Sequence, residues 1–153
     1  MPARKLKDFL DQNQIKYISV VHSPAYTAQE VAQSAHVTGK EFAKVVIVEL
    51  DEDMAMVVLP ATRKVVLQEL RELTGSDEVK FASEEEFRGR FPDCETGAMP
   101  PFGNLYGMDV YAAESLAENE EIAFNAGSHI EIIRMSFRDF DRLVRPRVMS
   151  FTN

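Results

Sequence analysis

The spacing of apolar residues along the chain switches between the three-to-four-residue period of helices and the two-residue period of strands. Helical spacing predicts helices over residues 4–13, 27–35, 62–74, 83–90 and 137–145. Alternating or continuous apolar runs predict strands over residues 17–21, 43–50, 54–59, 79–82, 110–112, 121–125 and 130–135. The order follows no steady β-α-β rhythm, which favours an α+β fold around a mixed, mainly antiparallel sheet flanked by helices.

Local signals indicate where several of these elements begin and end. Thr27-Ala28-Gln29-Glu30 and Ser83-Glu84-Glu85-Glu86 have the capping-box pattern of helix starts, and Gly75 is a stop signal for the helix before it. The acidic segment 51–53 separates two strand-like runs. A β-hairpin is therefore predicted around that segment.

Length and composition limit the class of protein. The chain has 153 residues, 45% of them hydrophobic, which suits one well-packed core, so we expect a single domain over residues 1–153. No apolar leader follows the basic residues near the start, and no run of eighteen apolar residues occurs. We therefore expect a soluble, cytoplasmic protein with no membrane partner.

The charge is unevenly distributed. The formal net charge is −8, which argues against a strong free-standing nucleic-acid binder and against a DNA partner. Residues 1–45 carry six Lys/Arg against four Asp/Glu, and residues 134–153 carry five Arg against two Asp. The middle of the chain holds the other six basic and nineteen acidic residues. A local anionic ligand such as an RNA end is compatible with this pattern.

Common catalytic signatures are missing. His22, His36 and His129 are not at metal-ligand spacing, and glycine-rich phosphate-binding motifs are absent, so we expect no metal and no other cofactor. Cys94 is the single cysteine and lies in a polar loop, which favours a bystander thiol. Ser128 precedes His129, but neighbours along a strand point to opposite faces, so they do not form a nucleophile and its base.

Lys44 is the most informative residue, because it opens an apolar strand. It shares a strand face with Val46 and Val48. A buried ammonium group is costly unless an anion or ligand offsets its desolvation. Two interpretations remain open from position alone. Lys44 is either a strand-end residue whose amine reaches water, or the cation of a binding site.

The segment 91–106 lacks amphipathic periodicity and contains three prolines and two glycines. Pro100 and Pro101 stiffen it, while Gly97 and Gly103 allow another group to approach the backbone closely. A rigid loop of this kind can present main-chain N–H and C=O groups to a ligand. The alternative is a stiff connector with Phe102 packed into the core.

Two further features carry charge or a titratable group. The segment 125–129 reads as a turn that places His129 at the start of the next strand, where a histidine is either structural or in contact with a substrate hydroxyl. Arg134, Arg138 and Arg142 recur every four residues and would share one helix face if the last helix began early enough. That face is either solvated or a surface for RNA phosphates or a partner.

Three features follow one another along the chain: Lys44 opening an apolar strand, then Gly97-x-x-x-Pro101, and then Gly127-Ser128-His129 before a strand. With these features in this order, the chain resembles the YbaK/prolyl-tRNA synthetase editing-domain family. The resemblance covers nearly the whole chain, from the segment 22–32 to the final helix. Members of that family include stand-alone aminoacyl-tRNA deacylases. The resemblance therefore implies hydrolysis of the ester that joins a wrongly attached amino acid to the 3′ acceptor end of tRNA.

The resemblance also implies the site. Lys44 would bind the acceptor-end phosphate or polarise the ester, main-chain groups around Gly97 would orient water or hold the oxyanion, and His129 would contact the substrate end. The residues that it implies for substrate binding are His22, Tyr26, Pro101, Phe102, Gly103, Gly127 and Ser128. A ribose hydroxyl would share the proton transfer. Aminoacyl-tRNA is the implied partner, with an aminoacyl-tRNA synthetase or an elongation factor to present it.

One residue departs from the family pattern. Several branches have Thr or Asn directly after the lysine, and this chain has Val45. The identity of the amino acid is therefore open, with alanine or serine as the expected size class. Two other functions remain as alternatives: a catalytically silent binding module with the same fold, and a hydrolase of small aminoacyl esters or thioesters that does not need the tRNA.

Overall fold

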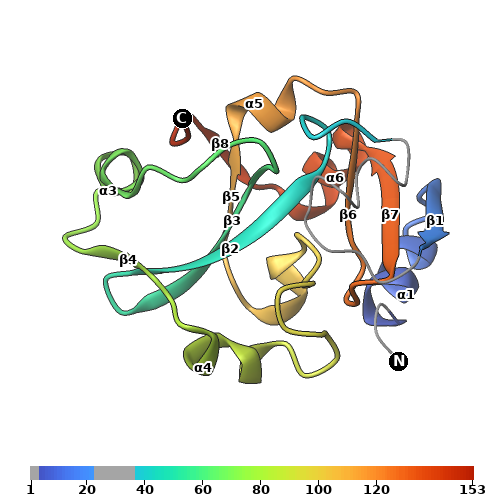
Figure 1. The fold of residues 1–153 in the computed structure, drawn as a ribbon, viewed down its shortest axis with the longest axis horizontal. Helices are drawn as coiled ribbons and strands as arrows, with labels where there is room; N and C mark the ends of the chain where they lie inside the picture. Colours follow the sequence, from blue (N-terminus) through green and yellow to red (C-terminus); the bar gives the residue numbers. More distant parts are fainter. Residues whose placement is uncertain (1–3, 23–36) are drawn as a thin grey trace.

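Two β-sheets organise the part of the chain that the computed structural model describes, residues 4–22 and 37–153 (Figure 1). The strands are β1 (Tyr17–Val21), β2 (Ala43–Leu50), β3 (Asp53–Pro60), β4 (Val79–Phe81), β5 (Val110–Ala113), β6 (Glu121–Asn125), β7 (Glu131–Ser136) and β8 (Arg147–Met149). The helices in these ranges are α1 (Arg4–Gln12), α3 (Leu67–Thr74), α4 (Glu84–Phe87), α5 (Glu114–Ala117) and α6 (Phe137–Val144), with 3-10 turns at Arg88–Arg90 and Gly103–Tyr106.

The larger sheet has the strand order β4-β2-β3-β5-β8, and the smaller has the order β1-β7-β6. β2 and β3 form the predicted antiparallel hairpin, paired from Ala43 opposite Pro60 to Leu50 opposite Asp53. β5 pairs in parallel with both β3 and β8, whereas β7 pairs antiparallel with β1 and β6. The predicted α+β fold with mixed, mainly antiparallel pairing is confirmed, with the strands divided between two sheets. The domain bounds 1–153 stay a prediction.

A bridge joins the two sheets. Phe42 and Ala123 form an isolated parallel bridge, and the Ala123 N–H donates to the Glu41 carbonyl at 3.0 Å. Both residues are fully buried and pack with Val37 and Ile132. Beyond the bridge, β2 continues in the larger sheet and β6 in the smaller one. The two strands therefore start side by side and run in the same direction, each within its own sheet.

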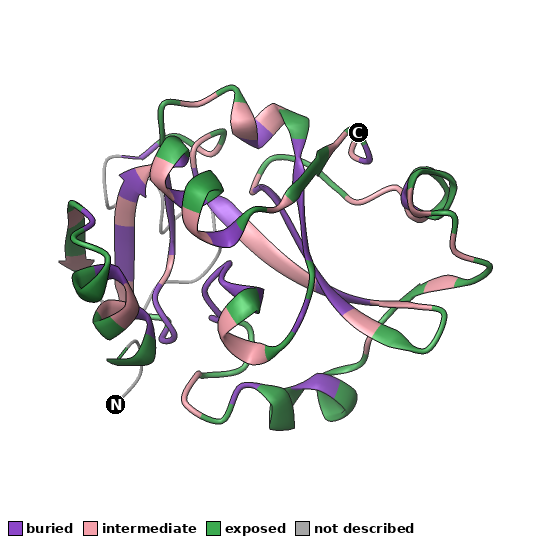
Figure 2. Ribbon diagram, turned by 180° about the vertical axis from the view of Figure 1, so that it is seen from behind, coloured by how far each residue is buried: buried purple, intermediate pink, exposed green. Residues whose placement is uncertain are grey.

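The main hydrophobic core lies where the sheets face each other. Its largest members include Phe102, Phe124 and Phe140, and the Phe102 ring centroid lies 5.6 Å from that of Phe124 and 5.5 Å from that of Phe140. A second cluster covers the other face of the larger sheet and includes Leu70 of α3. Figure 2 shows buried residues concentrated in the central strands and exposed residues on the outer helices and loops.

The helix predicted over residues 62–74 is wrong in its first part, because α3 begins at Leu67. Val65 bridges Thr152, and the Val66 N–H donates to the Phe151 carbonyl at 2.7 Å. Residues 62–66 are thus held by the C-terminal segment, which competes successfully with the helical hydrogen bonds. The end of α3 is as predicted: Gly75 caps it with a left-handed φ of 71°.

Other local predictions are confirmed where the structure describes the residues. Ser83 forms the complete capping box with Glu86, and the Ser136 side chain accepts from the Asp139 N–H to cap α6. The short elements α5 and β8 were not predicted from the pattern. The helix predicted over residues 27–35 lies outside the described residues.

The predicted arginine stripe does not form on one helix. α6 begins at Phe137, so Arg134 belongs to β7 instead. The Arg134 Nε lies 3.8 Å from a carboxylate oxygen of Glu121, and Arg142 donates to Asp139 at 3.2 Å. Since the strand-to-helix change separates Arg134 from the other two, the three guanidinium groups do not share a face.

Candidate active site

The Gly97 loop and the Gly127 turn are bound together by their backbones. The Glu95 N–H donates to the Gly127 carbonyl at 2.8 Å, and the Gly127 N–H donates to the Ala98 carbonyl at 2.9 Å. Gly97 and Gly127 both have positive φ angles, 88° and 92°, which side chains with a Cβ rarely adopt. The two glycines therefore allow two tight turns to meet at one place. The sequence predicted the loop and the turn separately and did not predict that they meet.

His129 completes this meeting point. Its Nε2 lies 3.0 Å from the Thr96 carbonyl oxygen. A Cβ added at Gly97 would lie 3.5 Å from the His129 Cε1 atom, so the ring faces the Gly97 backbone directly. A carbonyl oxygen can only accept, so Nε2 carries the proton in this contact. In the neutral ring, Nδ1 is then left as a hydrogen-bond acceptor for a ligand.

The main chain at Gly97 offers a donor. The Gly97 N–H contacts the Met99 Sδ at 3.3 Å, and a thioether is a weak acceptor. A carbonyl or carboxylate oxygen of a ligand would be a better partner for this N–H group. Gly97 is also exposed, so a ligand can reach it.

Lys44 lies near the start of β2, and its side chain is half-buried. Its Nζ is 3.5 Å from the Ala61 carbonyl oxygen, which is at the outer limit of a hydrogen bond. Desolvation by burial, followed by repulsion from Lys64, lowers the pKa of Lys44 from its ordinary value. No described carboxylate forms an ion pair with this amine. Lys44 is thus a partly desolvated cation without a protein counter-ion in the described part of the chain.

The structure brings Gly97 and His129 together, but Lys44 makes no hydrogen bond to either of them within the described residues. Topology nevertheless places them on the same side of the bridge between the sheets. Lys44 comes two residues after Phe42, and the Gly127 turn follows β6 shortly after Ala123. Because the bridged strands run in parallel, both features lie beyond the bridge in the same direction.

Asn125 is a candidate site residue that the sequence prediction did not include. It comes two residues after Ala123, as Lys44 comes two after Phe42, so both lie about 7 Å beyond the bridge. Strand alternation places both on the face of the cluster that contains Phe42 and Ala123. The Asn125 Oδ1 atom is buried and has no hydrogen-bond partner among the residues that the structure describes. A buried unpaired amide oxygen is unusual and marks a place where a ligand donor would fit.

Some residues predicted to bind substrate have packing roles in this structure. Phe102 is fully buried in the main core, with its ring centroid 6.2 Å from that of Phe9. Gly103 is buried too, and a Cβ there would lie 2.8 Å from the Val110 Cγ2 atom. We therefore assign Phe102 and Gly103 to the core. The alternative interpretation of the loop, a stiff connector with Phe102 packed into the core, describes Phe102 correctly. Pro101 is also buried and fixes the end of the loop.

The remaining predicted binding residues lie around the turn or outside the described ranges. The His22 N–H donates to the Ile130 carbonyl at 2.8 Å, which places the end of β1 beside the turn. Ser128 is buried, and its Oγ accepts weakly from the Ile130 N–H at 3.4 Å. Gly127 holds the backbone contacts described above. Tyr26 lies outside the described residues.

Val45 and Cys94 both belong to the main-core side of the structure. Val45 packs against the cluster that contains Met99 and Phe102, on the opposite face of β2 from Lys44. Cys94 is half-buried, with its Sγ 3.4 Å from the Tyr106 hydroxyl, and burial raises the pKa of its thiol to about 11. A thiol of this kind is protonated at neutral pH and is a poor nucleophile.

Neither a metal-binding cluster nor a membrane-spanning helix occurs among the described residues. Across residues 4–22 and 37–153, no group of three or more His, Cys, Asp or Glu side chains is arranged to hold a metal ion. Within the same ranges, no helix has the length and apolar character needed to cross a membrane.

Comparison with known proteins identifies the family. A sequence model described as the aminoacyl-tRNA editing domain matches residues 22–143. The chain belongs to the aminoacyl-tRNA editing-domain family. The predicted family and the predicted activity, aminoacyl-tRNA deacylation, are thereby confirmed. The substrate class of this editing domain is accordingly aminoacyl-tRNA.

Relatives cover nearly the whole of the editing domain. It is 23% identical over 149 residues to the prolyl-tRNA editing protein ProX of Acetoanaerobium sticklandii, across 93% of this chain and 90% of that protein. A crystal structure described as a candidate trans-editing enzyme for prolyl-tRNA synthetase matches with a TM-score of 0.85 at 19% identity, covering 99% and 96% of the two chains. A hypothetical protein of known structure matches with a TM-score of 0.88 at 18% identity, covering 98% and 100%. These structural matches show the shared fold.

Proposed function

We propose that this editing domain acts in trans, in the cytoplasm, on tRNA that carries a wrongly attached small amino acid such as alanine or serine. A synthetase or an elongation factor would present the tRNA, since a chain with a net charge of −8 binds RNA weakly by itself. The relative named as a prolyl-tRNA editing protein supports a tRNA that prolyl-tRNA synthetase has misacylated.

The observation that carries the proposal is the contact between His129 and Gly97. The His129 Nε2 lies 3.0 Å from the Thr96 carbonyl oxygen, and beside the ring lies the partly buried N–H of Gly97, whose acceptor is a thioether. An acceptor nitrogen and a main-chain donor are thus fixed next to each other. The acceptor nitrogen suits the amino group or ribose hydroxyl of an aminoacyl ester, and the main-chain donor suits the carbonyl oxygen of that ester.

In the proposed reaction, water attacks the ester carbonyl carbon and the bond to the ribose oxygen breaks. The Gly97 N–H stabilises the negative charge that develops on the carbonyl oxygen. The water proton passes through a ribose hydroxyl to the leaving oxygen, so no carboxylate base is needed. Lys44 supplies a positive charge for the acceptor-end phosphate or the ester, and Asn125 offers its unpaired oxygen to a donor on the substrate.

The test is deacylation of a panel of misacylated tRNAs by the wild-type protein and by Lys44→Ala. We expect the variant to lose about 10²- to 10³-fold in kcat, the range for removing one preorganised electrostatic group. Lys16→Ala is the matched control, because it removes an exposed lysine outside the β2–β3 hairpin. The proposal is wrong if no aminoacyl-tRNA in the panel is cleaved faster by the wild type than by Lys44→Ala.

A second substrate arm separates tRNA editing from hydrolysis of small esters. Trimming the tRNA to an aminoacyl nucleoside should lower kcat/KM, because contacts with the nucleic acid are lost. Undiminished activity on the trimmed substrate would support the small-ester alternative instead.

A further inference from the structure

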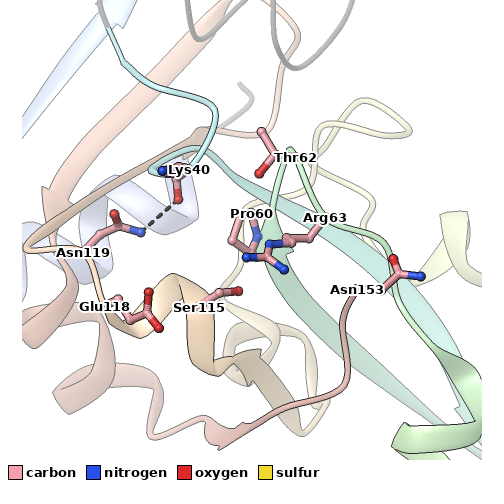
Figure 3. Close-up of a pocket in the computed structure, with 8 residues that line it drawn as sticks. All are labelled: Lys40, Pro60, Thr62, Arg63, Ser115, Glu118, Asn119 and Asn153. Atoms are coloured by element: carbon pink, nitrogen blue, oxygen red, sulfur yellow. Dashed lines mark hydrogen bonds between the residues drawn. The ribbon is translucent and has the colours of Figure 1, made fainter.

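A cleft of about 410 Å³ lies outside the candidate active site, between the end of β3, α5 and the C-terminal segment (Figure 3). Its volume is within the range of small-molecule sites. It is lined by Lys40, Pro60, Thr62, Arg63, Ser115, Glu118, Asn119 and Asn153. The cleft shares a wall with the candidate site, because Pro60 to Arg63 flank the Ala61 carbonyl that contacts Lys44.

The walls of the cleft are fixed by hydrogen bonds across the fold. The Asn119 side-chain amide donates to the Lys40 carbonyl at 2.9 Å (Figure 3). It also donates to the Leu116 carbonyl at 3.2 Å. On the other side, the Asn153 N–H donates to the Lys64 carbonyl at 3.1 Å. The cleft is thus built by four separate parts of the chain that are held in place before any ligand binds.

Three polar side chains of the cleft have no protein partner among the described residues. Neither Lys40 nor Arg63 forms an ion pair there, although both side chains are exposed at the cleft. The Ser115 Oγ atom is buried and finds no hydrogen-bond partner in the described part of the chain. Figure 3 shows the Arg63 guanidinium group and the Ser115 hydroxyl directed toward the space between β3 and α5.

The set of groups selects a class of ligand. Two cations and a hydroxyl suit a phosphate. The Glu118 carboxylate would repel a bare anion, but it can accept a hydrogen bond from a sugar hydroxyl. A ribose phosphate presents both kinds of group, and the 2′-hydroxyl is what distinguishes RNA from DNA at such a site.

We propose that this cleft binds a ribose-phosphate unit of the acceptor strand of tRNA, with Lys40, Arg63 and Ser115 on the phosphate and Glu118 on the ribose. The inference rests on the proposed function and extends it, because it gives the RNA backbone a place next to Lys44. The cleft positions the strand, and the residues near the Gly127 turn act on the ester.

The test measures binding of an uncharged acceptor-stem RNA hairpin by fluorescence anisotropy, with no chemistry required. Arg63→Ala and Lys40→Ala should each weaken binding about tenfold and reduce the slope of log affinity against log salt by about one. Ser115→Ala should weaken binding with no change in that slope. Arg138→Ala is the matched control, because it removes an exposed arginine on α6, away from the cleft.

Further arms establish the nature of the ligand. Glu118→Gln should reduce the preference for the RNA hairpin over the same hairpin made of DNA. Arg63→Lys keeps the charge and should retain most of the affinity, which checks that losses do not come from misfolding. Inorganic phosphate or AMP that competes with the hairpin at equal concentration would overturn the assignment to RNA.

Failure of the cleft and failure of the proposed function give different results. Wild-type affinity in Arg63→Ala, Lys40→Ala and Ser115→Ala, or an equal loss in Arg138→Ala, would overturn the cleft proposal whether or not the protein deacylates tRNA. Loss of hairpin binding in the cleft variants, without deacylation of any misacylated tRNA by wild type, would support the cleft and overturn the editing reaction.

Discussion

The two ends of the β2–β3 hairpin carry opposite charge. The open end has Lys44 on β2, Arg63 and Lys64 just after β3, and Lys40 just before β2. The turn end has Asp51, Glu52 and Asp53, and these line a surface hollow together with Asp77 and Glu78. Since both strands have eight residues, the two ends lie about 25 Å apart.

This difference shows that the net charge of −8 does not describe the charge that a ligand meets at the open end of the hairpin. At an ionic strength of 0.15 M the Debye length is about 8 Å, so an anion at the open end is largely screened from the acidic turn. Local cations then decide binding, while the distant acids repel an RNA that approaches in the wrong orientation. If RNA binds at the open end as proposed, the hairpin would orient the polyanion as well as bind it.

Reversing the charge of the open end should have the largest effect. The double substitution Lys40→Glu with Arg63→Glu replaces two phosphate contacts by two repulsions, so we expect KM for misacylated tRNA to rise about 100-fold or more. Steady-state deacylation at fixed salt measures this change. The same reversal at Arg138 should leave KM nearly unchanged, and an equal rise there would place the RNA on α6 instead.

At the turn end, Asp51→Ala should affect stability rather than RNA binding. The Asp51 Oδ1 accepts from the Asp77 N–H at 3.0 Å and from the Glu78 N–H at 2.9 Å, and Asp51 has a left-handed φ of 58°. Loss of these hydrogen bonds, together with the strain at a non-glycine left-handed residue, should cost about 1–2 kcal/mol in free energy of unfolding.

Urea denaturation measures this loss. Asp51→Asn keeps an oxygen acceptor and tolerates the left-handed conformation, so it should remain close to wild type. Equal destabilisation by both substitutions would show that charge, and not the hydrogen bonds, is what matters at this turn.

Neutralising the acids at the turn end should speed RNA association slightly. Glu52→Gln with Glu78→Gln removes two charges that repel RNA, so we expect the association rate to rise about two- to threefold at low salt. Stopped-flow fluorescence with the acceptor-stem hairpin measures the rate. The gain should vanish near 0.5 M salt, and a gain that persists there would exclude long-range repulsion as its cause.

The smallest expected effect concerns the titration of Lys44. Its charged form is disfavoured first by burial and then by Lys64, which together lower its pKa. Lys64→Met removes the like charge, so the pKa of Lys44 should rise toward the ordinary lysine value. NMR titration of the lysine Cε resonances measures it. The charged form would then persist to higher pH, and a downward shift would contradict the described arrangement.

Sequence patterns predicted best those elements whose stability is local. The hairpin, the Ser83 capping box and the Gly75 helix stop depend on residues within a few positions of one another, and the structure has all three. The helix prediction failed for residues 62–66, because this segment is hydrogen-bonded to the C-terminal segment, almost ninety positions away in the chain. The apolar spacing there reflects packing in the second core cluster and not a helix.

The candidate site was predicted only in part. Lys44, Gly97 and His129 came from a family resemblance, and the structure places two of them in contact. Asn125 lies in the turn motif that drew attention to His129, but its unpaired oxygen is visible only once burial is known. The cleft near Arg63 was not predictable, because its walls come from four distant segments that carry no shared motif.

The bridge between Phe42 and Ala123 has a consequence for how the site keeps its dimensions. Lys44 belongs to one sheet and the Gly127 turn to the other, and beyond the bridge no described strand pairing spans them. Their separation is therefore set by the thickness of the packed core, in which Phe102 is fully buried. Core volume would act as the spacer of the candidate active site, so a change of one interior side chain would alter the fit of a substrate there without touching the substrate.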